Sequence, residues 1–294
     1  MSQPRKITLI GTGLMGAPMS RNLMKAGYDL TVWNRSAERA APLVAQGAKT
    51  AATAAEAIAG AEVIITMLSD GFATGALLAD DGFCGALAAG MIWIDMSSAK
   101  PEQARAQSAQ LAKLGVHHLD APVSGGTKGA EAGGLAIMVG GEVPVFDAMQ
   151  DVFRAMGRPV HVGPTGAGQL CKLANQTIVG VTIAAVAEAT LLAQKGGADP
   201  VALRAALKGG FADSVILQQH GARMSEGNFV PGGMSKIQRK DLDNTLAEAA
   251  ALGLELPATQ AVRDRFDYLV EEMDGGDLDH AGLYLELKER NNLK

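Results

Sequence analysis

Three glycines near the start of the chain strongly limit how it can fold. Gly11, Gly13 and Gly16 have the spacing G-x-G-x-x-G, directly after the apolar run KITLIG and at the start of an amphipathic segment. In such a setting the first glycine permits a tight turn, the second lets the backbone come close to a ligand, and the third allows the helix to pack closely. The spacing therefore predicts a strand, a turn and a helix whose first amides face an anion.

The region that follows makes this glycine turn a candidate dinucleotide site. A second predicted strand ends about twenty residues further on, at TVWNRSAER, as it does in dinucleotide-binding units. We predict that the pyrophosphate of a dinucleotide binds at the turn formed by Gly11, Gly13 and Gly16, with Leu14 and Met15 between them. A glycine turn that binds no ligand is the alternative.

The end of the second strand bears on which dinucleotide binds. NAD-specific proteins usually present an Asp or Glu there to the ribose 2′-hydroxyl, whereas this chain has Asn34, Arg35 and Ser36. An amide and a guanidinium can donate hydrogen bonds to a 2′-phosphate, with Arg39 one helical turn further on as additional support. The sequence favours NADP as cofactor, and it leaves NAD and a solvated loop without a ligand as alternatives.

The pattern of strands and helices changes near residue 163. Before this point β-rich runs alternate with Ala- and Leu-rich segments, and the run 63–68 is apolar on both faces, which predicts a mostly parallel sheet covered by helices on both sides. After GPTGAG at 163–168, strand-like runs vanish and apolar residues recur at helical spacing. We predict an α/β domain with a doubly wound sheet over residues 1–163 and an all-α domain over residues 164–294, joined by a long helix.

Charge and apolar runs exclude several classes of partner. With 26 basic and 31 acidic residues the formal net charge is −5, so no overall positive field attracts nucleic acid or an anionic membrane. The N-terminal apolar run is too short for a signal peptide, and no later run approaches the roughly 18 residues needed to cross a bilayer. We expect a cytoplasmic protein without a nucleic-acid or membrane partner. The cysteines and histidines lack metal-ligand spacing, so no metal is expected.

One lysine stands in an otherwise mostly apolar helical segment, GQLCKLANQTIVG at 168–180. Lys172, Asn175 and Gln176 are spaced i, i+3 and i+4 and therefore share one face of the predicted helix. Hydride addition to a carbonyl places negative charge on its oxygen, so a nearby proton donor lowers the barrier. We predict Lys172 as a general acid and base, and a surface lysine on an amphipathic helix is the alternative.

The loop DAPVSGGTKGAEAG is rich in glycine around Ser124. A hydroxyl and the amides of Gly125 and Gly126 can surround a carboxylate without bulky side chains. This composition is compatible with a small carboxylate substrate, and a loop that binds no ligand is the alternative.

Five motifs occur in an order that resembles one family. They are GTGLMGAPMSRNLMKAGY, DMSSAKP, DAPVSGGTKGAEAG, GQLCKLANQ and KDLDN. The chain resembles the β-hydroxyacid dehydrogenases, which include 3-hydroxyisobutyrate dehydrogenases and 2-hydroxy-3-oxopropionate (tartronate semialdehyde) reductases, from Ile7 to its terminal helices. The resemblance implies an N-terminal Rossmann domain, a helical domain for substrate binding and dimerisation, an active site between the domains, and a homodimer or homotetramer.

The resemblance also implies roles for individual residues. Lys172 corresponds to the catalytic lysine, and the other catalytic or substrate-binding positions are Asn175, Gln176, Ser124, Gly125 and Gly126. Further cofactor contacts are implied for Leu68, Ser69, Ser98 and Lys240. Ser69 departs from the family pattern, which has proline there. The pair Asn175-Gln176, where many relatives have Asn-Asn, looks more like the tartronate semialdehyde reductase branch.

The predicted function is NADP(H)-dependent hydride transfer to or from a small β-hydroxyacid or its semialdehyde. One alternative is a nucleotide-binding module that has lost catalysis, against which the retained Lys172 and Asn175 argue. Another is an imine or succinic semialdehyde reductase of the same architecture, although imine reductases usually replace the catalytic lysine. The sequence does not choose among 3-hydroxyisobutyrate, glycerate with tartronate semialdehyde, succinic semialdehyde and threonate-like acids.

Overall fold

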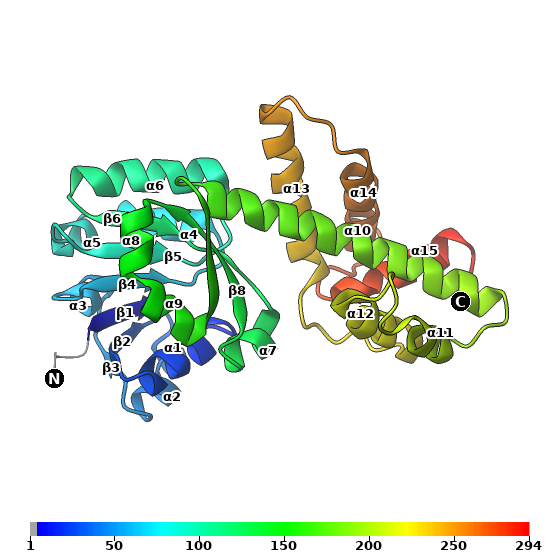
Figure 1. Ribbon diagram of the computed structural model, residues 1–294, viewed down its shortest axis with the longest axis horizontal. Coiled ribbons are helices and arrows are strands. Elements are labelled where there is room, and N and C mark those ends of the chain that lie inside the picture. The colour runs from blue at the N-terminus through cyan, green and yellow to red at the C-terminus, as the bar shows by residue number, and fades with distance from the viewer. Residues whose placement is uncertain (1–4, 294) are drawn as a thin grey trace. The chain divides into compact units, whose positions relative to one another are not determined.

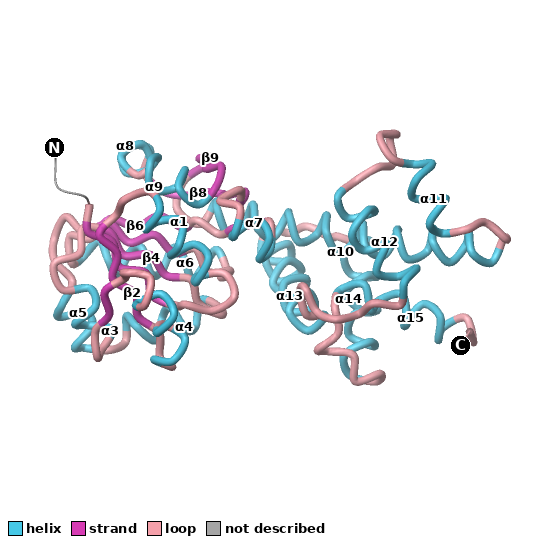
Figure 2. Tube along the Cα trace, turned by 90° about the horizontal axis from the view of Figure 1, so that it is seen from below, coloured by secondary structure: helices cyan, strands magenta, loops and turns pink. Residues whose placement is uncertain are grey.

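The computed structural model describes residues 5–293 and forms two compact units, one up to Lys172 and the other from Leu173 onward. Every strand in the described residues belongs to the first unit, and the second unit is made of helices (Figure 1, Figure 2). One long helix, α10 (Ala167–Lys195), begins in the first unit and ends in the second. The predicted combination of an α/β unit, a long helix and an all-α unit is confirmed.

The first unit is built on one sheet with the order β3-β2-β1-β4-β5-β6-β8-β7, and β9 pairs with β8. Its strands are β1 (Lys6–Ile10), β2 (Asp29–Trp33), β3 (Lys49–Thr50), β4 (Val63–Thr66), β5 (Ile92–Asp95), β6 (His117–Asp120), β7 (Val123–Ser124), β8 (Leu135–Gly141) and β9 (Gly157–Gly163). The strands from β3 to β6 are parallel, and β8 runs antiparallel to β6 and β7. Because the chain reverses direction across the sheet after β3, the predicted doubly wound topology is confirmed.

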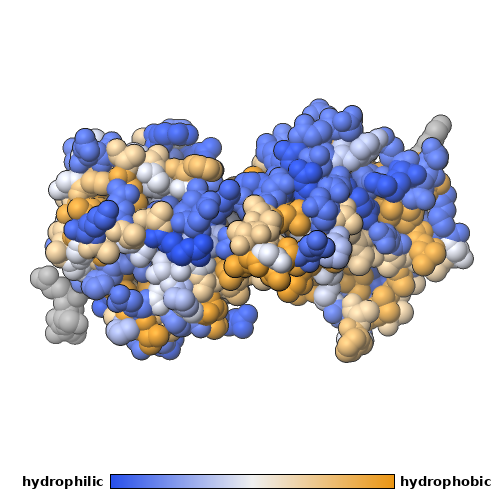
Figure 3. All heavy atoms as spheres, turned by 90° about the horizontal axis from the view of Figure 1, so that it is seen from above, coloured by the Kyte–Doolittle hydropathy of each residue, from blue (hydrophilic) through white to orange (hydrophobic). Residues whose placement is uncertain are grey.

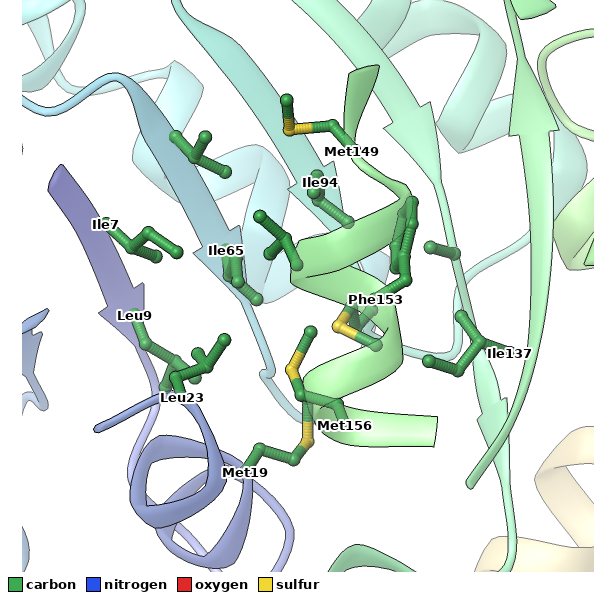
Figure 4. Close-up of a cluster of buried hydrophobic side chains, with 14 of the residues drawn as sticks. Ile7, Leu9, Met19, Leu23, Ile65, Ile94, Ile137, Met149, Phe153 and Met156 are labelled. Atoms are coloured by element: carbon green, nitrogen blue, oxygen red, sulfur yellow. The ribbon is translucent and has the colours of Figure 1, made fainter. Parts of the chain in front are cut away.

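One face of the sheet packs against α1 (Gly16–Lys25) and α9 (Gln150–Met156), as the close-up in Figure 4 shows. The buried side chains of this layer include Ile7, Leu9, Met19, Leu23, Ile65, Ile94, Phe153 and Met156. Burying one such side chain stabilises the fold by roughly 1.5 to 3 kcal/mol. This layer therefore fixes α1, and with it the glycine turn, against the strands.

Alternate residues of the same strands point to the opposite face. Ile10, Ile64 and Trp93 pack there in a second buried cluster. Its helices are α3 (Ala54–Ile58), α4 (Gly71–Leu78), α5 (Asp81–Ala86) and α6 (Pro101–Lys113). Burial on both faces explains why the central strands are apolar throughout. Shorter elements complete the unit: η1 (Ala37–Arg39), α2 (Ala41–Val44), α7 (Gly126–Glu131) and α8 (Val143–Ala148).

The second unit packs helices around the later part of α10. They are α11 (Pro200–Leu207), α12 (Val215–Glu226), α13 (Ser235–Ala251), α14 (Pro257–Glu271), η2 (His280–Gly282) and α15 (Leu283–Arg290). Ile183 and Ala187 of α10 are buried against Leu242 of α13 and Phe266 of α14 in one apolar cluster. The helical unit thus has its own core, as an independently packed unit requires.

Helix α10 corrects one statement made from the sequence. It has 29 residues with a window of mean hydropathy 1.6, so by length and composition it meets the criterion for a membrane span that no run was expected to approach. Its many alanines and few charges raise the hydropathy, and 44% of that window is buried inside the protein. Core helices packed among neighbours meet the same criterion, so this property alone does not identify a membrane segment.

Candidate cofactor and active site

The first unit has a cavity of about 950 Å³ where the chain leaves β1, β2 and β4. The carboxyl ends of parallel strands are the usual ligand-binding edge of such sheets. Ten residues predicted from the sequence line this cavity: Gly11, Gly13, Leu14, Met15, Gly16, Asn34, Arg35, Ser36, Leu68 and Ser69. Arg39 lines it as well, whereas Ser98 and Lys240 are not among its lining residues. The structure therefore brings together most of the predicted cofactor residues in one place.

The glycine turn leaves room for a ligand at one position and for none at the other two. A Cβ atom at Gly11, where φ is +102°, would lie 2.3 Å from the Met67 carbonyl oxygen, and a Cβ at Gly16 would lie 1.8 Å from the Gly11 oxygen. A Cβ at Gly13 would meet no heavy atom within 4 Å, although Gly13 lines the cavity. Gly11 and Gly16 thus close the turn, and the space beside Gly13 at the start of α1 fits a pyrophosphate.

Asn34 fastens the end of β2 to this turn. Its Oδ1 accepts a hydrogen bond from the Thr12 amide at 3.0 Å, and its Nδ2 donates to the Ser36 carbonyl oxygen at 3.0 Å. One Nδ2 hydrogen is therefore engaged with the backbone, so Asn34 has less to offer a phosphate than its position in the sequence indicates. Two guanidinium groups, those of Arg35 and Arg39, line the same cavity from exposed positions.

A buried network supports the loop after β4. The Leu68 amide donates to Ser97 Oγ at 2.9 Å, and both the Ser97 amide and Thr66 Oγ1 donate to Asp95 Oδ1 at 3.0 and 2.9 Å. Asp95 is 1% exposed, and its burial raises the pKa of the carboxyl. The loop with Ser69 is thus held through the backbone of its neighbour Leu68.

Sequence reasoning missed the apolar wall of the cavity. The wall includes Trp33, Ala54, Ala73, Ala76, Leu77 and Phe83, from the end of β2 and from the region of α3, α4 and α5. Asp80 adds one acidic side chain, whose Oδ1 accepts from the Phe83 amide at 2.8 Å. Small residues on α4 were the available signal, because alanine at helical spacing leaves space for a flat ligand, but the same spacing also fits a core helix.

The predicted carboxylate site lies at the end of β7. Ser124 ends this strand and is partly exposed, and the exposed Gly125 and Gly126 have φ values of +139° and +60°. Residues other than glycine rarely adopt such φ values, so the backbone conformation itself favours glycine at both positions. The geometry keeps this backbone free of side-chain bulk beside the Ser124 hydroxyl.

The candidate catalytic residues of α10 belong to different units. Lys172 is partly exposed and is the last residue of the first unit, whereas Asn175 and Gln176 belong to the second. Asn175 Nδ2 donates to Gln176 Oε1 at 2.8 Å, and Gln176 Nε2 donates to Asp241 Oδ2 at 2.9 Å and to Gln238 Oε1 at 3.2 Å. Gln176 is 8% exposed, so its amide serves mainly to join α10 to α13.

Lys240 lies on α13, and its Nζ is 3.4 Å from Asp241 Oδ1. That oxygen accepts no well-directed hydrogen bond among the described residues, so we treat the contact as an ion pair. The structure thus gives Lys240 the acidic neighbour that its sequence position indicates. In residues 5–293 no three His, Cys, Asp or Glu side chains come together as a metal site, and Cys84 and Cys171 form no disulfide.

Two family models together match nearly all of the chain. Residues 6–166 match the NAD binding domain of 6-phosphogluconate dehydrogenase, and residues 166–287 match a model described as NAD-binding of NADP-dependent 3-hydroxyisobutyrate dehydrogenase. The first of these matches alone covers more than half of the chain.

Individual relatives agree with these matches. The chain is 40% identical to the 2-hydroxy-3-oxopropionate reductase of Escherichia coli K12, over 98% of this chain and 99% of that protein. It is 36% identical to the 3-hydroxyisobutyrate dehydrogenase of Pseudomonas aeruginosa, over 94% and 95% of the two chains. A solved structure of Mycobacterium tuberculosis 3-hydroxyisobutyrate dehydrogenase with L-serine is similar with a TM-score of 0.89 and 31% identity, covering 97% of this chain and 100% of that one. The chain belongs to the β-hydroxyacid dehydrogenase family and is an NAD(P)-dependent enzyme of that family.

Proposed function

We propose that this enzyme uses NADP(H) to interconvert a small β-hydroxyacid and its semialdehyde. The observation that carries the cofactor preference is the cavity itself, which combines the glycine turn with Arg35 and Arg39 and has Asn34 where an NAD-specific protein has an acid. The substrate class is supported by the 2-hydroxy-3-oxopropionate reductase and 3-hydroxyisobutyrate dehydrogenase relatives.

The two parts of the chain have different proposed roles. Residues 1–163 bind the cofactor, and residues 164–294 contribute to substrate binding and to a homodimer or homotetramer. Large apolar side chains are exposed in several places on the helical unit (Figure 3), which favours contact with further copies of the chain. They include Ile178, Leu192, Val201, Phe211, Val215 and Val230.

In the proposed reaction the nicotinamide supplies or takes up the hydride. Lys172 Nζ gives a proton to the carbonyl oxygen during reduction and takes it back from the hydroxyl during oxidation. The Ser124 hydroxyl and the Gly125 and Gly126 amides hold the substrate carboxylate, since hydrogen bonds to a charged group are stronger than neutral ones. Asn175, oriented by its hydrogen bond to Gln176, adds a polar contact beside the reacting oxygen.

Other predicted contacts keep secondary roles in this proposal. Four residues are assigned cofactor contacts: Leu68, Ser69, Ser98 and Lys240. Gln176 holds the Asn175 side chain through their hydrogen bond. Each role is testable separately, because these residues lie on different elements of the chain.

The test is a panel of semialdehydes and hydroxyacids assayed with both cofactors. We expect loss of NADPH absorbance with tartronate semialdehyde or the semialdehyde of 3-hydroxyisobutyrate, and a higher kcat/KM with NADPH than with NADH. Preference for NADH would reject the cofactor assignment. Tight NADPH binding without turnover of any panel member would reject the enzymatic proposal in favour of a nucleotide-binding module.

A further inference from the structure

One buried glutamine connects the start of α10 to the loop after β5. Gln169 is 0% exposed; its Oε1 accepts from the Ala99 amide at 2.9 Å and its Nε2 donates to the Ser97 carbonyl oxygen at 2.8 Å. These two backbone groups stand on either side of Ser98, the predicted cofactor contact. One side-chain amide therefore holds the backbone on both sides of Ser98.

The backbone of Gln169 is itself fixed. Asp120, at the end of β6 and 0% exposed, accepts from the Gly166 amide at 2.8 Å through Oδ1 and from the Gln169 amide at 2.9 Å through Oδ2. These amides stand at the start of α10, where helix N–H groups lack partners within the helix. A carboxylate there also interacts favourably with the helix dipole.

The junction around Asp120 has no space for adjustment. A Cβ atom at Gly140 would lie 2.5 Å from Asp120 Oδ1, and one at Gly168 would lie 2.4 Å from the Asp120 carbonyl oxygen. The ends of β6 and β8 and the start of α10 therefore meet at backbone contact. Such packing transmits a displacement rather than absorbing it.

We infer that Gln169 is a positioning residue that sets Ser98 relative to Lys172. Lys172 follows Gln169 by three residues on the same helix, so it is less than one turn away, about 4.5 Å along the axis. Holding Gln169 against the Ser98 loop thus fixes both the height and the rotation of α10 where Lys172 projects. The inference rests on the proposed function, in which Ser98 contacts the cofactor and Lys172 moves the proton.

The same clamp reaches a second cofactor loop. Ser97, whose carbonyl oxygen Gln169 holds, uses its Oγ to accept from the Leu68 amide. Leu68 lines the cofactor cavity. Gln169 therefore supports two loops on the cofactor side through one backbone segment, and its amide suits both partners because one is a donor and the other an acceptor.

The first test replaces this amide with an apolar side chain of similar size. Gln169→Met should lower kcat by about 10- to 100-fold, because a displacement on the order of 1 Å at a reacting group has effects of this size. The NADPH dissociation constant, measured by calorimetry without substrate, should rise by a smaller factor than kcat falls, because the loops of Ser98 and Leu68 are disturbed while the glycine turn and the two arginines are untouched. Gln107→Met is the matched control.

Gln107 is comparable to Gln169 in burial but not in position. It is 5% exposed on α6, and its Nε2 donates to the Gly71 carbonyl oxygen at 3.3 Å. Because Gln107 Oε1 accepts no hydrogen bond in the described residues, Gln107→Met should lose less thermal stability than Gln169→Met, and it should keep kcat within about twofold of the parent when both variants are assayed at a temperature at which they are fully folded. Equal losses of kcat in the two variants would mean that Gln169 acts only through stability and would overturn the inference.

A second variant carries the test if Gln169→Met does not fold. In Gln169→Glu a protonated carboxyl can donate to Ser97 and accept from Ala99, whereas the ionised form can only accept. The kcat of this variant relative to the parent should therefore fall by more than about fivefold as the pH rises from 6 to 9, with full recovery on return to pH 6. Infrared spectroscopy over the same range reports the ionisation of the introduced carboxyl, and a kcat ratio that stays constant while this carboxyl ionises would contradict the positioning role.

The two levels of proposal fail in different ways. A parent enzyme that turns over no semialdehyde with NADPH defeats the proposed function. An active parent together with an equally active Gln169→Met defeats only the positioning role of Gln169.

Discussion

The two units bury aspartates in opposite electrostatic settings. In the first unit Asp120 accepts hydrogen bonds from backbone amides, and burial still raises its pKa to about 6, partly offset by the amides of Gly166 and Gln169. In the second unit Asp279 is 1% exposed, and burial alone would raise its pKa as well. A contact from His220 and the amides of Ala281 and Gly232 instead hold the pKa of Asp279 well below its ordinary value.

The side chains that face Asp279 distinguish it from Asp120. His220 Nδ1 lies 3.3 Å and Arg223 Nη1 lies 3.7 Å from the carboxylate of Asp279. The 3.3 Å contact is poorly directed for a hydrogen bond, so we regard it as electrostatic. At Asp120 the backbone amides thus only reduce the effect of burial on the pKa, whereas at Asp279 the contact with His220 and the backbone amides together outweigh it.

The two aspartates also hold different parts of the molecule. Asp120 caps the helix that carries Lys172, whereas Asp279 binds the Gly232 amide at 2.9 Å and the Ala281 amide at 3.0 Å and so fixes the loop before α13. The less compensated acid is therefore beside the candidate site, where perturbed groups are often found. Asp120 thus supports the start of the helix with the proposed proton donor, and Asp279 supports a loop of the helical unit.

The largest effect is expected from removing Lys172, the proposed proton donor of the first unit. Lys172→Ala should reduce turnover by a factor on the order of 10² to 10⁴, the range for loss of a general acid, while NADPH binding persists. Lys195→Ala, at the exposed opposite end of the same helix, is the control and should retain parental turnover. Steady-state kinetics with the preferred semialdehyde measures both. Turnover within a few-fold of the parent in Lys172→Ala would exclude this lysine from the chemistry.

Replacing Asp279, the buried aspartate of the second unit, should lower the free energy of unfolding. Asp279→Asn removes the charge that faces His220 and Arg223 and weakens the hydrogen bonds that the loop amides donate to this side chain. We expect the free energy of unfolding to fall by about 3 kcal/mol. Asp277→Asn is the control, since Asp277 is exposed and contacts Lys236 at the surface, and it should change stability by less than about 0.5 kcal/mol. Urea unfolding followed by circular dichroism measures the difference. Similar stabilities of the two variants would show that Asp279 is dispensable for the loop.

The aspartates should affect stability in different pH ranges. The folded pKa of Asp120, about 6, lies above its ordinary 3.8, so its contribution to stability is full below about pH 4 and is lost as the pH rises through 6. Asp279 has the opposite sign: its contribution is present above about pH 4 and is lost as the pH falls further.

A buried histidine masks the effect of Asp120. His118 is 6% exposed, and burial lowers its pKa from 6.5 to about 4, so its contribution is present above pH 6.5 and is lost as the pH falls through 4. Shifts of this size correspond to about 3 kcal/mol each, and they oppose one another between pH 4 and 6.5. Asp120→Asn should therefore lose unfolding free energy more steeply than the parent on acidification over this range. Parallel curves of unfolding free energy against pH for the variant and the parent would show that folding does not raise the pKa of Asp120.

The local part of the site was predictable because its signals are close together in the chain. Gly11, Gly13 and Gly16 lie within six residues, and the position of Arg35 follows from the strand after them. Eight of the ten predicted residues that line the cavity come from the glycine turn and the end of β2, whereas Leu68 and Ser69 were implied by the family resemblance.

The remaining contacts join residues far apart in sequence, so no spacing rule indicates them. Gln169 and Ala99 are 70 residues apart, and Asp120 and Gln169 are 49 apart. The engagement of Asn34 with the Thr12 amide likewise depends on how β1 and β2 pair. The hydropathy of α10 was underestimated for a different reason: its polar residues interrupt every apolar run, although the mean over an 18-residue window is still 1.6.

The cofactor preference gives the smallest of these effects and can be tested against a close control. Arg35→Ala should remove a charge-assisted contact to the 2′-phosphate, a loss of about 1.5 to 3 kcal/mol that weakens NADPH selectively and leaves NADH nearly unchanged. Arg21→Ala is the control: Arg21 lies on α1, its Nε donates to Gln46 Oε1 at 3.2 Å, and it does not line the cavity. Calorimetric titration with each cofactor gives the two dissociation constants.

Adding Asn34→Asp to Arg35→Ala should shift the preference further toward NADH, because a carboxylate repels the phosphate and accepts from the ribose hydroxyls. The hydrogen bonds of Asn34 set a limit on this gain. A carboxylate still accepts from the Thr12 amide but cannot donate to the Ser36 oxygen, so we expect the double variant to unfold at a lower temperature than Arg35→Ala alone. A parent enzyme that already prefers NADH, or an Arg35→Ala variant that weakens both cofactors equally, would show that the two arginines of this cavity do not select the 2′-phosphate.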